Sequence, residues 1–178
     1  MKPYFLVFRN MVKFTLKKLK CQNLEVDGVQ MFDRNTKLLF DKSCKVKIGK
    51  HTVTDGRCVI VVDNGAELSI GDNCYFNEQA MISVKSSVKI GNGVKFGPNV
   101  KVFDNNHLFS KENGVSNAHN SLPIIIGDNT WLASNVVVLK GTTIGKNCVI
   151  GANCVVKGNI PDCSVVTNSG ELKIKPME

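Results

Sequence analysis

Aliphatic residues recur at every sixth position through the last third of the chain. Six consecutive hexapeptides begin with such a residue, which we call the anchor: Ile126, Leu132, Val138, Ile144, Ile150 and Val156. The second position of the hexapeptide is small in four of the six, and the fifth is mostly small or β-branched. The same period is present upstream, where a two-residue slip separates Ile70, Phe76 and Ile82 from Val84, Ile90, Phe96 and Val102. An earlier and looser set consists of Ile48, Thr54 and Ile60.

A period of six matches neither the 3.6 residues of a helical turn nor the alternation of an ordinary strand. It predicts short strands and turns that wind around a triangular prism, with every anchor pointing into the axis. Three hexapeptides make one coil of 18 residues, and successive coils stack by parallel strand pairing. Glycine and asparagine between the anchors suit turns that need positive φ. We therefore expect an all-β chain, with the prism over residues 23–166 and a tail over residues 167–178.

Four of the seven cysteines lie four residues after an anchor: Cys58, Cys74, Cys148 and Cys154. Cysteine in such a position is a small buried filler, so we expect no catalytic or metal-binding role for it. No two cysteines have the Cys-x-x-Cys spacing of zinc ribbons and thioredoxin-like redox sites.

The repeat is interrupted once, after Val102. From Val102 to Ile126 there are 24 residues, where an unbroken repeat needs six. The sequence therefore predicts that a protruding loop over residues 104–123 leaves the prism and that the chain re-enters it in phase. Long loops inside compact repeats are commonly functional or disordered.

Two of the three histidines lie in this predicted loop. His107 directly follows the last regular hexapeptide, so the prism would hold it firmly, whereas His119 lies among small polar residues. His51 falls in a turn position of its hexapeptide. His107 is thus the first functional candidate, and the alternative for each of the three is a surface histidine.

The net charge of +8 is concentrated at the N-terminus. Residues 1–20 contain six lysines and arginines and no acidic residue, and the other 17 basic residues nearly balance the 15 acidic ones. Apolar residues at three- and four-residue steps predict an amphipathic helix within residues 1–22: Phe5, Phe8, Val12, Leu16 and Leu19. Two interpretations are open. The helix packs on the prism with a solvated basic face, or residues 1–20 contact an anionic membrane surface.

Composition narrows the classes of partner. Aromatic residues make up only 7% with a single tryptophan, which argues against a base-stacking surface and a nucleic-acid partner. No apolar run approaches the ~20 residues of a membrane-spanning helix. Arg9 and Lys13 break the apolar stretch at the start, so we expect no signal peptide. A cytoplasmic, reduced protein is expected, with the inner face of the membrane as a second location.

These features together resemble the left-handed parallel β-helix acyltransferases. Within them the chain is similar to the galactoside, maltose and xenobiotic O-acetyltransferases and to the related polysaccharide acetyltransferases. The segments IGNGVKFGPNVKVFDNNH and LPIIIGDNTWLASNVVVLKGTTIG carry the likeness. The family's Asn on one coil, its catalytic His at the start of the loop and its Trp after the loop fall on Asn77, His107 and Trp131.

The resemblance implies acetyl transfer from acetyl-CoA to a hydroxyl. His107 would be the general base, since a neutral imidazole takes a hydroxyl proton near pH 7. A loop carbonyl or Asp104 would fix its tautomer. Asn77 would orient the acceptor or donate to the oxyanion, and its alternative is a plain turn residue.

The resemblance also implies a coenzyme A site along a prism edge. Trp131 and Ser134 would contact the coenzyme, and backbone near Ala152 would meet the pantetheine arm. Lys157, Lys173 and Lys175 would meet the phosphates, or else be solvated. The family's Gly-x-Pro-Ala-Lys segment is reduced here to Lys173. The resemblance further implies a homotrimer with active sites between subunits, and no metal.

Three functions compete on these grounds. The first is O-acetylation of a sugar in surface-polysaccharide or glycolipid synthesis. The second is N-acetylation of an amino sugar nucleotide, and the third is a non-catalytic β-helix for binding or assembly. A zinc hydratase on the same prism would need three histidines around the metal, and the chain has no His-x₄-His or comparable pair.

Overall fold

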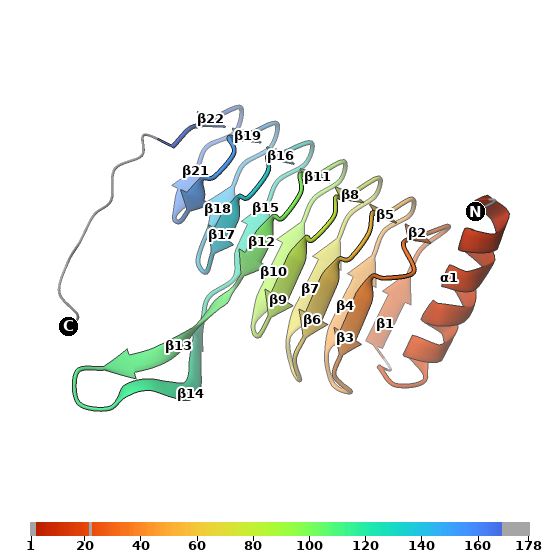
Figure 1. Cartoon of the computed structure of the whole chain (residues 1–178), viewed down its shortest axis with the longest axis horizontal. Coiled ribbons are helices and arrows are strands. Elements are labelled where there is room, and N and C mark those ends of the chain that lie inside the picture. Colours follow the sequence, from red (N-terminus) through yellow and green to blue (C-terminus); the bar gives the residue numbers. More distant parts are fainter. Residues whose placement is uncertain (1–2, 22, 169–178) are drawn as a thin grey trace.

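A computed structural model describes residues 3–21 and 23–168 of the chain (Figure 1). Its β-helix has three parallel sheets, which we call A, B and C. Sheet A consists of β1 (Asn23–Val26), β4 (Lys45–Ile48), β7 (Glu67–Ile70), β10 (Ser87–Ile90), β15 (Ile124–Ile126), β18 (Thr143–Ile144) and β21 (Asn159–Ile160). Sheet B consists of β2 (Met31–Phe32), β5 (Val53–Thr54), β8 (Tyr75–Phe76), β11 (Lys95–Phe96), β16 (Trp131–Leu132), β19 (Val149–Ile150) and β22 (Val165–Val166). Sheet C consists of β3 (Lys37–Phe40), β6 (Val59–Val62), β9 (Met81–Val84), β12 (Lys101–Phe103), β17 (Val137–Leu139) and β20 (Val155–Val156).

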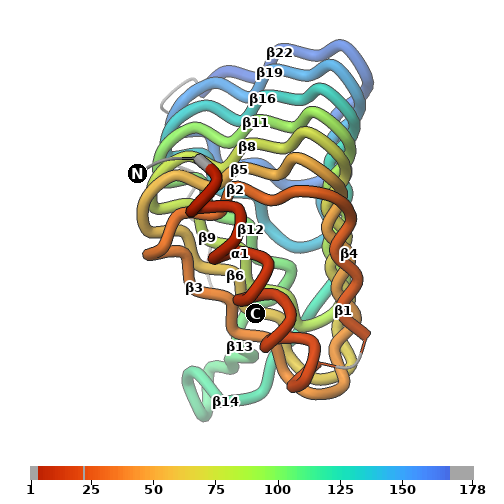
Figure 2. Tube along the Cα trace, turned by 90° about the vertical axis from the view of Figure 1, so that its right-hand side faces the viewer, coloured from red at the N-terminus to blue at the C-terminus, as the bar shows by residue number. Residues whose placement is uncertain are grey.

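Each coil contributes its strands to sheets A, B and C in that order, and the coils stack into the predicted prism (Figure 2). All of the predicted anchors are buried, with at most 5% of any side chain exposed. Equivalent anchors lie in register in adjacent coils, as Ile126 does with Ile144 and Val138 does with Val156. The prediction of an all-β, left-handed parallel β-helix with a short N-terminal helix and a protruding segment is confirmed.

The predicted coil length of 18 residues holds only in part. It is right for the coils that join Trp131 to Val149, but Lys45 pairs with Glu67, 22 residues further on. The extra residues lie in the corner between sheets C and A, where four residues, 41–44, separate β3 from β4. A corner turn can lengthen outward without moving the buried anchors, so the phase of the core survives while the coil length changes.

Asparagine supplies many of the turns, as predicted. Asn129, Asn135, Asn147 and Asn153 all have φ between 54° and 61°, the left-handed conformation that asparagine tolerates. Gly145 is required for a different reason, because a Cβ there would lie 2.5 Å from a backbone nitrogen of the next coil. Small residues at the corners thus let consecutive coils approach closely.

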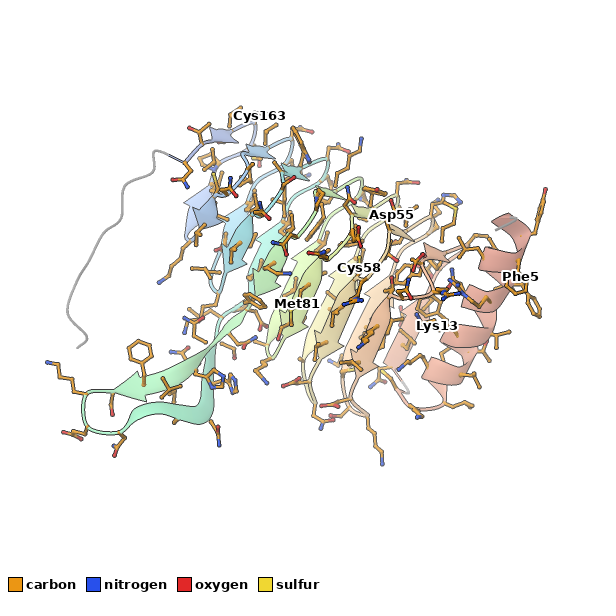
Figure 3. The ribbon with its side chains drawn as sticks, viewed as in Figure 1. Phe5, Lys13, Asp55, Cys58, Met81 and Cys163 are labelled. Carbon is orange, nitrogen blue, oxygen red and sulfur yellow. The ribbon has the colours of Figure 1, made fainter. Side chains whose placement is uncertain are left out.

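The cysteines behave as predicted from their spacing. Cys58, Cys74, Cys148 and Cys154 are buried, and burial raises the pKa of both Cys58 and Cys74 to about 11. Cys163, by contrast, lies exposed at the edge of the last coil (Figure 3). The buried thiols are therefore protonated at neutral pH and serve as packing groups.

Helix α1 (Pro3–Lys18) lies across the N-terminal end of the prism, as Figure 2 shows. The expectation that its apolar stripe faces the prism is wrong. Asn10 and Phe14 are buried instead, and the ring of Phe14 packs edge-on against Phe32 of the first coil at 5.2 Å. The predicted stripe from Phe5 to Leu19 is exposed to solvent.

The reason for this orientation is the open edge of the first coil. In the second coil, the carbonyls of Thr52, Thr54 and Cys58 accept hydrogen bonds from backbone N–H groups of the first. The equivalent carbonyls of the first coil have no preceding coil to supply donors, and an unpaired buried carbonyl is costly. Side chains of α1 supply those donors, as the next paragraph describes.

Polar and basic side chains of α1 donate five hydrogen bonds to this edge. Asn10 Nδ2 donates to the carbonyls of Gln30 and Phe32, and Arg9 donates to that of Phe32 as well. Lys13 Nζ and Lys17 Nζ donate at 2.6 Å to the carbonyls of residues 36 and 38. Burial, followed by the neighbouring cations, lowers the pKa of Lys13. The basic face is therefore the packed face of this helix.

Candidate functional site

The segment between sheets C and A of the fifth coil forms a two-stranded antiparallel ribbon. Its strands are β13 (Asn105–Ser110) and β14 (Gly114–Ser121), and the ribbon projects from the side of the prism (Figure 1). It leaves from the same corner at which the earlier coils carry their extra residues. The insertion thus enlarges a turn that is already variable, and the prism continues beyond it undisturbed.

Asp104 fixes the base of this ribbon. Its side chain is fully buried, and its carboxylate accepts hydrogen bonds from the backbone N–H of Lys85, of Ser86 and from the amide of Asn105 at 2.7–3.1 Å. Its own carbonyl accepts from the N–H of Leu122 on the returning strand. Asp104 therefore ties both strands of the ribbon to the corner of the preceding coil.

His107 lies on β13, three residues beyond this base, with its side chain exposed. Its Nδ1 is 2.9 Å from the carbonyl oxygen of Ser116 on β14. A carbonyl can only accept, so Nδ1 carries the proton and Nε2 of the neutral ring has a free lone pair. Of the two predicted tautomer partners, the loop carbonyl is the one observed, and Asp104 instead binds the corner of the neighbouring coil.

His119 is the cross-strand neighbour of His107. The two rings lie 4.2 Å apart between centroids, at an angle of 41°. Loss of solvation and then the nearby Lys85 cation lower the pKa of His119, and His107 adds to this effect. The sequence analysis ranked His119 as a solvated loop residue and missed this pairing. The dipeptide Asn113-Gly114, a strong hairpin signal, lies midway between the two histidines and could have predicted it.

Asn77, Ser134 and Ala152 lie at the other end of sheet C, in the corner that follows sheet B. Asn77 Oδ1 accepts a hydrogen bond from the N–H of Glu78 at 2.7 Å, as a turn asparagine does. Ser134 and Ala152 occupy equivalent positions in consecutive coils of this corner. Beside them runs a ladder of amides, in which Asn99 donates to Asn135 and Asn135 donates to Asn153 at 2.9 and 3.0 Å.

One chain does not bring Asn77 and His107 together. Asn77 precedes the sheet C strand β9, and His107 follows the sheet C strand β12, which pairs with β9 in parallel. A strand of four residues spans about 13 Å, so the two side chains lie at opposite ends of this sheet. Any site that uses both residues needs a second subunit.

The remaining predicted coenzyme contacts are also spread out. Trp131 is 49% exposed on the outer face of sheet B, in register between Lys95 and Val149. Lys157 is exposed at the corner between sheets C and A, two coils beyond Phe103. Lys173 and Lys175 lie outside the described residues. Among the residues that are described, no three His, Cys, Asp or Glu side chains are grouped as metal ligands.

The three faces of the prism differ in polarity. The outer face of sheet A is charged, with ion pairs such as Lys45–Glu67 and Lys47–Glu25. The outer faces of sheets B and C are largely apolar: Met31, Val53, Tyr75, Trp131, Val149 and Val165 on B, and Leu39, Val59, Val61, Met81, Phe103, Val137, Leu139 and Val155 on C. Each of these side chains is exposed or half-buried. Two adjacent faces and the corner between them are thus suited to packing against other subunits.

Sequence comparison supports the repeat. The description "bacterial transferase hexapeptide (six repeats)" matches residues 123–158. WbbJ of Escherichia coli K12, named as an O-acetyl transferase of lipopolysaccharide biosynthesis, is 36% identical over 104 residues, which are 53% of each protein. YJL218W of Saccharomyces cerevisiae, named as an acetyltransferase, is 36% identical over 83 residues, or 47% of this chain and 42% of that protein. The chain therefore matches about half the length of these relatives.

Solved structures share the fold. AntD of Bacillus cereus, an N-acyltransferase in complex with dTDP and 3-hydroxybutyryl-CoA, superposes with a TM-score of 0.68 over 93% of this chain and 88% of AntD, at 13% identity. The hexapeptide-repeat acetyltransferase VCA0836 of Vibrio cholerae, in complex with acetyl coenzyme A, gives a TM-score of 0.61 over 95% of this chain and 78% of that one, at 19% identity. The predicted resemblance is confirmed for the repeat and the fold.

Proposed function

We propose that this hexapeptide-repeat β-helix is an acetyl-CoA-dependent O-acetyltransferase that acts on a sugar hydroxyl in surface-polysaccharide or glycolipid synthesis. The observation that carries the proposal is the state of His107. Its Nδ1–H is held by the Ser116 carbonyl, so Nε2 is presented to solvent as a base. The WbbJ match, which names O-acetyl transfer, supports the choice of a hydroxyl acceptor.

In the proposed reaction, Nε2 of His107 takes the proton of the sugar hydroxyl as that oxygen attacks the acetyl carbonyl. Acetyl-CoA supplies the activated acetyl thioester. The amide of Asn77 donates to the oxyanion or orients the acceptor. When the carbon–sulfur bond breaks, the proton held by His107 passes to the departing thiolate. The neutral imidazole is then restored with its Nδ1–H still on the Ser116 carbonyl.

His107 and Asn77 would come from different subunits. Their positions at opposite ends of sheet C, together with the apolar outer faces of sheets B and C, support a homotrimer whose sites lie between neighbouring prisms. In this arrangement the ribbon of one subunit reaches over the adjacent subunit. The charged outer face of sheet A then remains in water.

The coenzyme contacts are proposed on the same basis. The exposed ring of Trp131 offers an apolar surface, and Ser134 and Ala152 line the corner where the pantetheine arm would run between small side chains. Lys157, with Lys173 and Lys175, would meet the phosphates as point charges. Lys157 lies at the opposite end of sheet C from Ala152, which is consistent with a site built by two subunits.

The test is thiol release from acetyl-CoA over a panel of sugars, amino sugars and sugar nucleotides. We expect release with a sugar hydroxyl acceptor, and His107→Ala should lower kcat/KM about 10²- to 10⁴-fold, because a general base is removed. The matched control is His51→Asn, since His51 occupies a turn with φ of 58° that asparagine tolerates. Full activity of His107→Ala would refute the role of the histidine. Release only with amino sugar nucleotides would establish N-acetylation instead, and no release with any acceptor would favour the non-catalytic function.

A further inference from the structure

Helix α1 presents an apolar face to solvent. Seven large side chains form it, and we call them the outward face of α1: Tyr4, Phe5, Phe8, Met11, Val12, Leu16 and Leu19. Each is exposed by 45–85%. Figure 3 shows Phe5 directed away from the strands, whereas Lys13 lies on the side of the helix that meets the prism. This is the reverse of a soluble surface helix, which buries its apolar side.

The orientation is firmly held. Five hydrogen bonds from Arg9, Asn10, Lys13 and Lys17 to the first coil, together with the buried ring of Phe14, attach the opposite side of the helix. Turning the outward face inward would leave these carbonyls without donors and would bury at least one unpaired cation. The apolar face therefore needs a partner outside the chain to be covered.

Charge indicates which partner. Residues 1–20 have no acidic side chain, and Lys18 and Lys20 are exposed beside the outward face. A hollow next to Leu19 is lined by Lys20 and Lys42 together with Asp41, whose carboxylate already accepts the N–H of Asn64. An apolar face with aromatic rings and flanking lysines is complementary to acyl chains below a layer of anionic headgroups.

The position of the helix allows this contact. It lies across one end of the prism, with the coils stacked behind it, so a flat surface can approach it without meeting the ribbon (Figure 2). Its 16 residues give a length of about 24 Å, enough to lie in an interface. Among the residues that the structure describes, we find no helix with the length and apolar content that crossing a bilayer takes.

We propose that the outward face of α1 docks the protein on an anionic phospholipid bilayer. A second copy of the chain is the weaker alternative, because pairing two outward faces would bring lysines together with no acidic residue on either helix to neutralise them. In a trimer packed through the sides of its prisms, three such helices lie at the same end, so that three weak contacts act together. The docking rests on the helix and holds whatever reaction the β-helix performs.

Vesicle co-sedimentation of the full chain tests the proposal. We expect binding to phosphatidylcholine vesicles that contain phosphatidylglycerol to be at least about tenfold tighter than binding to phosphatidylcholine alone. Replacing both Phe5→Ser and Phe8→Ser should weaken binding to the anionic vesicles at least about tenfold, since two exposed rings are lost. The matched control is Val115→Ser, which removes a side chain of the ribbon that is 72% exposed, and it should bind as the wild type does.

Two outcomes would overturn the proposal. One is failure of the wild-type chain to bind anionic vesicles, and the other is unchanged binding of the Phe5 and Phe8 double variant. Sedimentation velocity identifies the alternative occupant, because a face that pairs two copies would make the assembly smaller in the double variant, and this too would overturn docking on lipid. Thermal unfolding should be unchanged, since both rings are solvent-exposed. Acetyl transfer to a soluble sugar should also be unchanged, so a failure of docking is distinguishable from a failure of the proposed reaction.

Discussion

Replacing Asp104→Asn should loosen the ribbon that carries His107. The buried carboxylate accepts from the backbone N–H of Lys85 and Ser86 at 2.7–3.1 Å. Asparagine keeps one acceptor oxygen but turns an NH₂ group toward a second N–H donor. A hydrogen bond to a charged group contributes about 1.5–3 kcal/mol, and a buried donor left unpaired costs about 1–3 kcal/mol. We therefore expect the free energy of unfolding to fall by about 2–4 kcal/mol.

Urea unfolding followed by circular dichroism measures this change. The matched control is Asp162→Asn, an exposed turn carboxylate that accepts one N–H, that of Lys146, at 2.8 Å. It should cost less than about 1 kcal/mol, since water can replace the lost contact. A loss below about 0.5 kcal/mol for Asp104→Asn would refute the conclusion that its carboxylate secures the corner. If His107 is the base, kcat should also fall more than tenfold, because small misplacements of a catalytic group are costly.

Two further predictions concern titrating groups. Lys85→Met should raise the pKa of His119 toward its ordinary value, because removal of a nearby cation favours the protonated imidazole; NMR titration of the ring would show it, and an unchanged pKa would contradict the assigned cause. In the folded chain at pH 7.5, a thiol reagent such as Ellman's should modify only Cys163 among the described cysteines that the structure shows, whereas all seven should react in denaturant. Rapid reaction of a second thiol in the native protein would show that the coils open.

The sequence predicted the β-helix well because its signal is repeated many times. Each anchor such as Ile126 or Ile144 must be buried, and a six-residue period has one economical solution in which every anchor reaches the axis. The coil length was less well predicted, because residues in the corner between sheets C and A are outside the core. Their number leaves the burial of the anchors unchanged, so no hydrophobic pattern records it.

The candidate site was predicted in its parts and not in its arrangement. His107 was singled out from its place after the last hexapeptide, but its partner, the carbonyl of Ser116, is a backbone group that carries no side-chain signal. His119 joined it only through the register of the ribbon. The separation of Asn77 from His107 depends on which end of sheet C each one occupies, a property of the coil and not of local sequence.

The N-terminal helix shows the same limit most clearly. By itself the sequence determined that residues near the N-terminus form an amphipathic helix and that a hexapeptide prism follows, since both follow from the spacing of side chains. Only the tertiary structure decided which side of that helix meets the prism. The first coil ends in unpaired backbone carbonyls, and donors such as Asn10 and Lys13 satisfy them better than apolar side chains can. Hydrogen bonding to backbone therefore outweighed apolar burial at this end, and the apolar face was left outward.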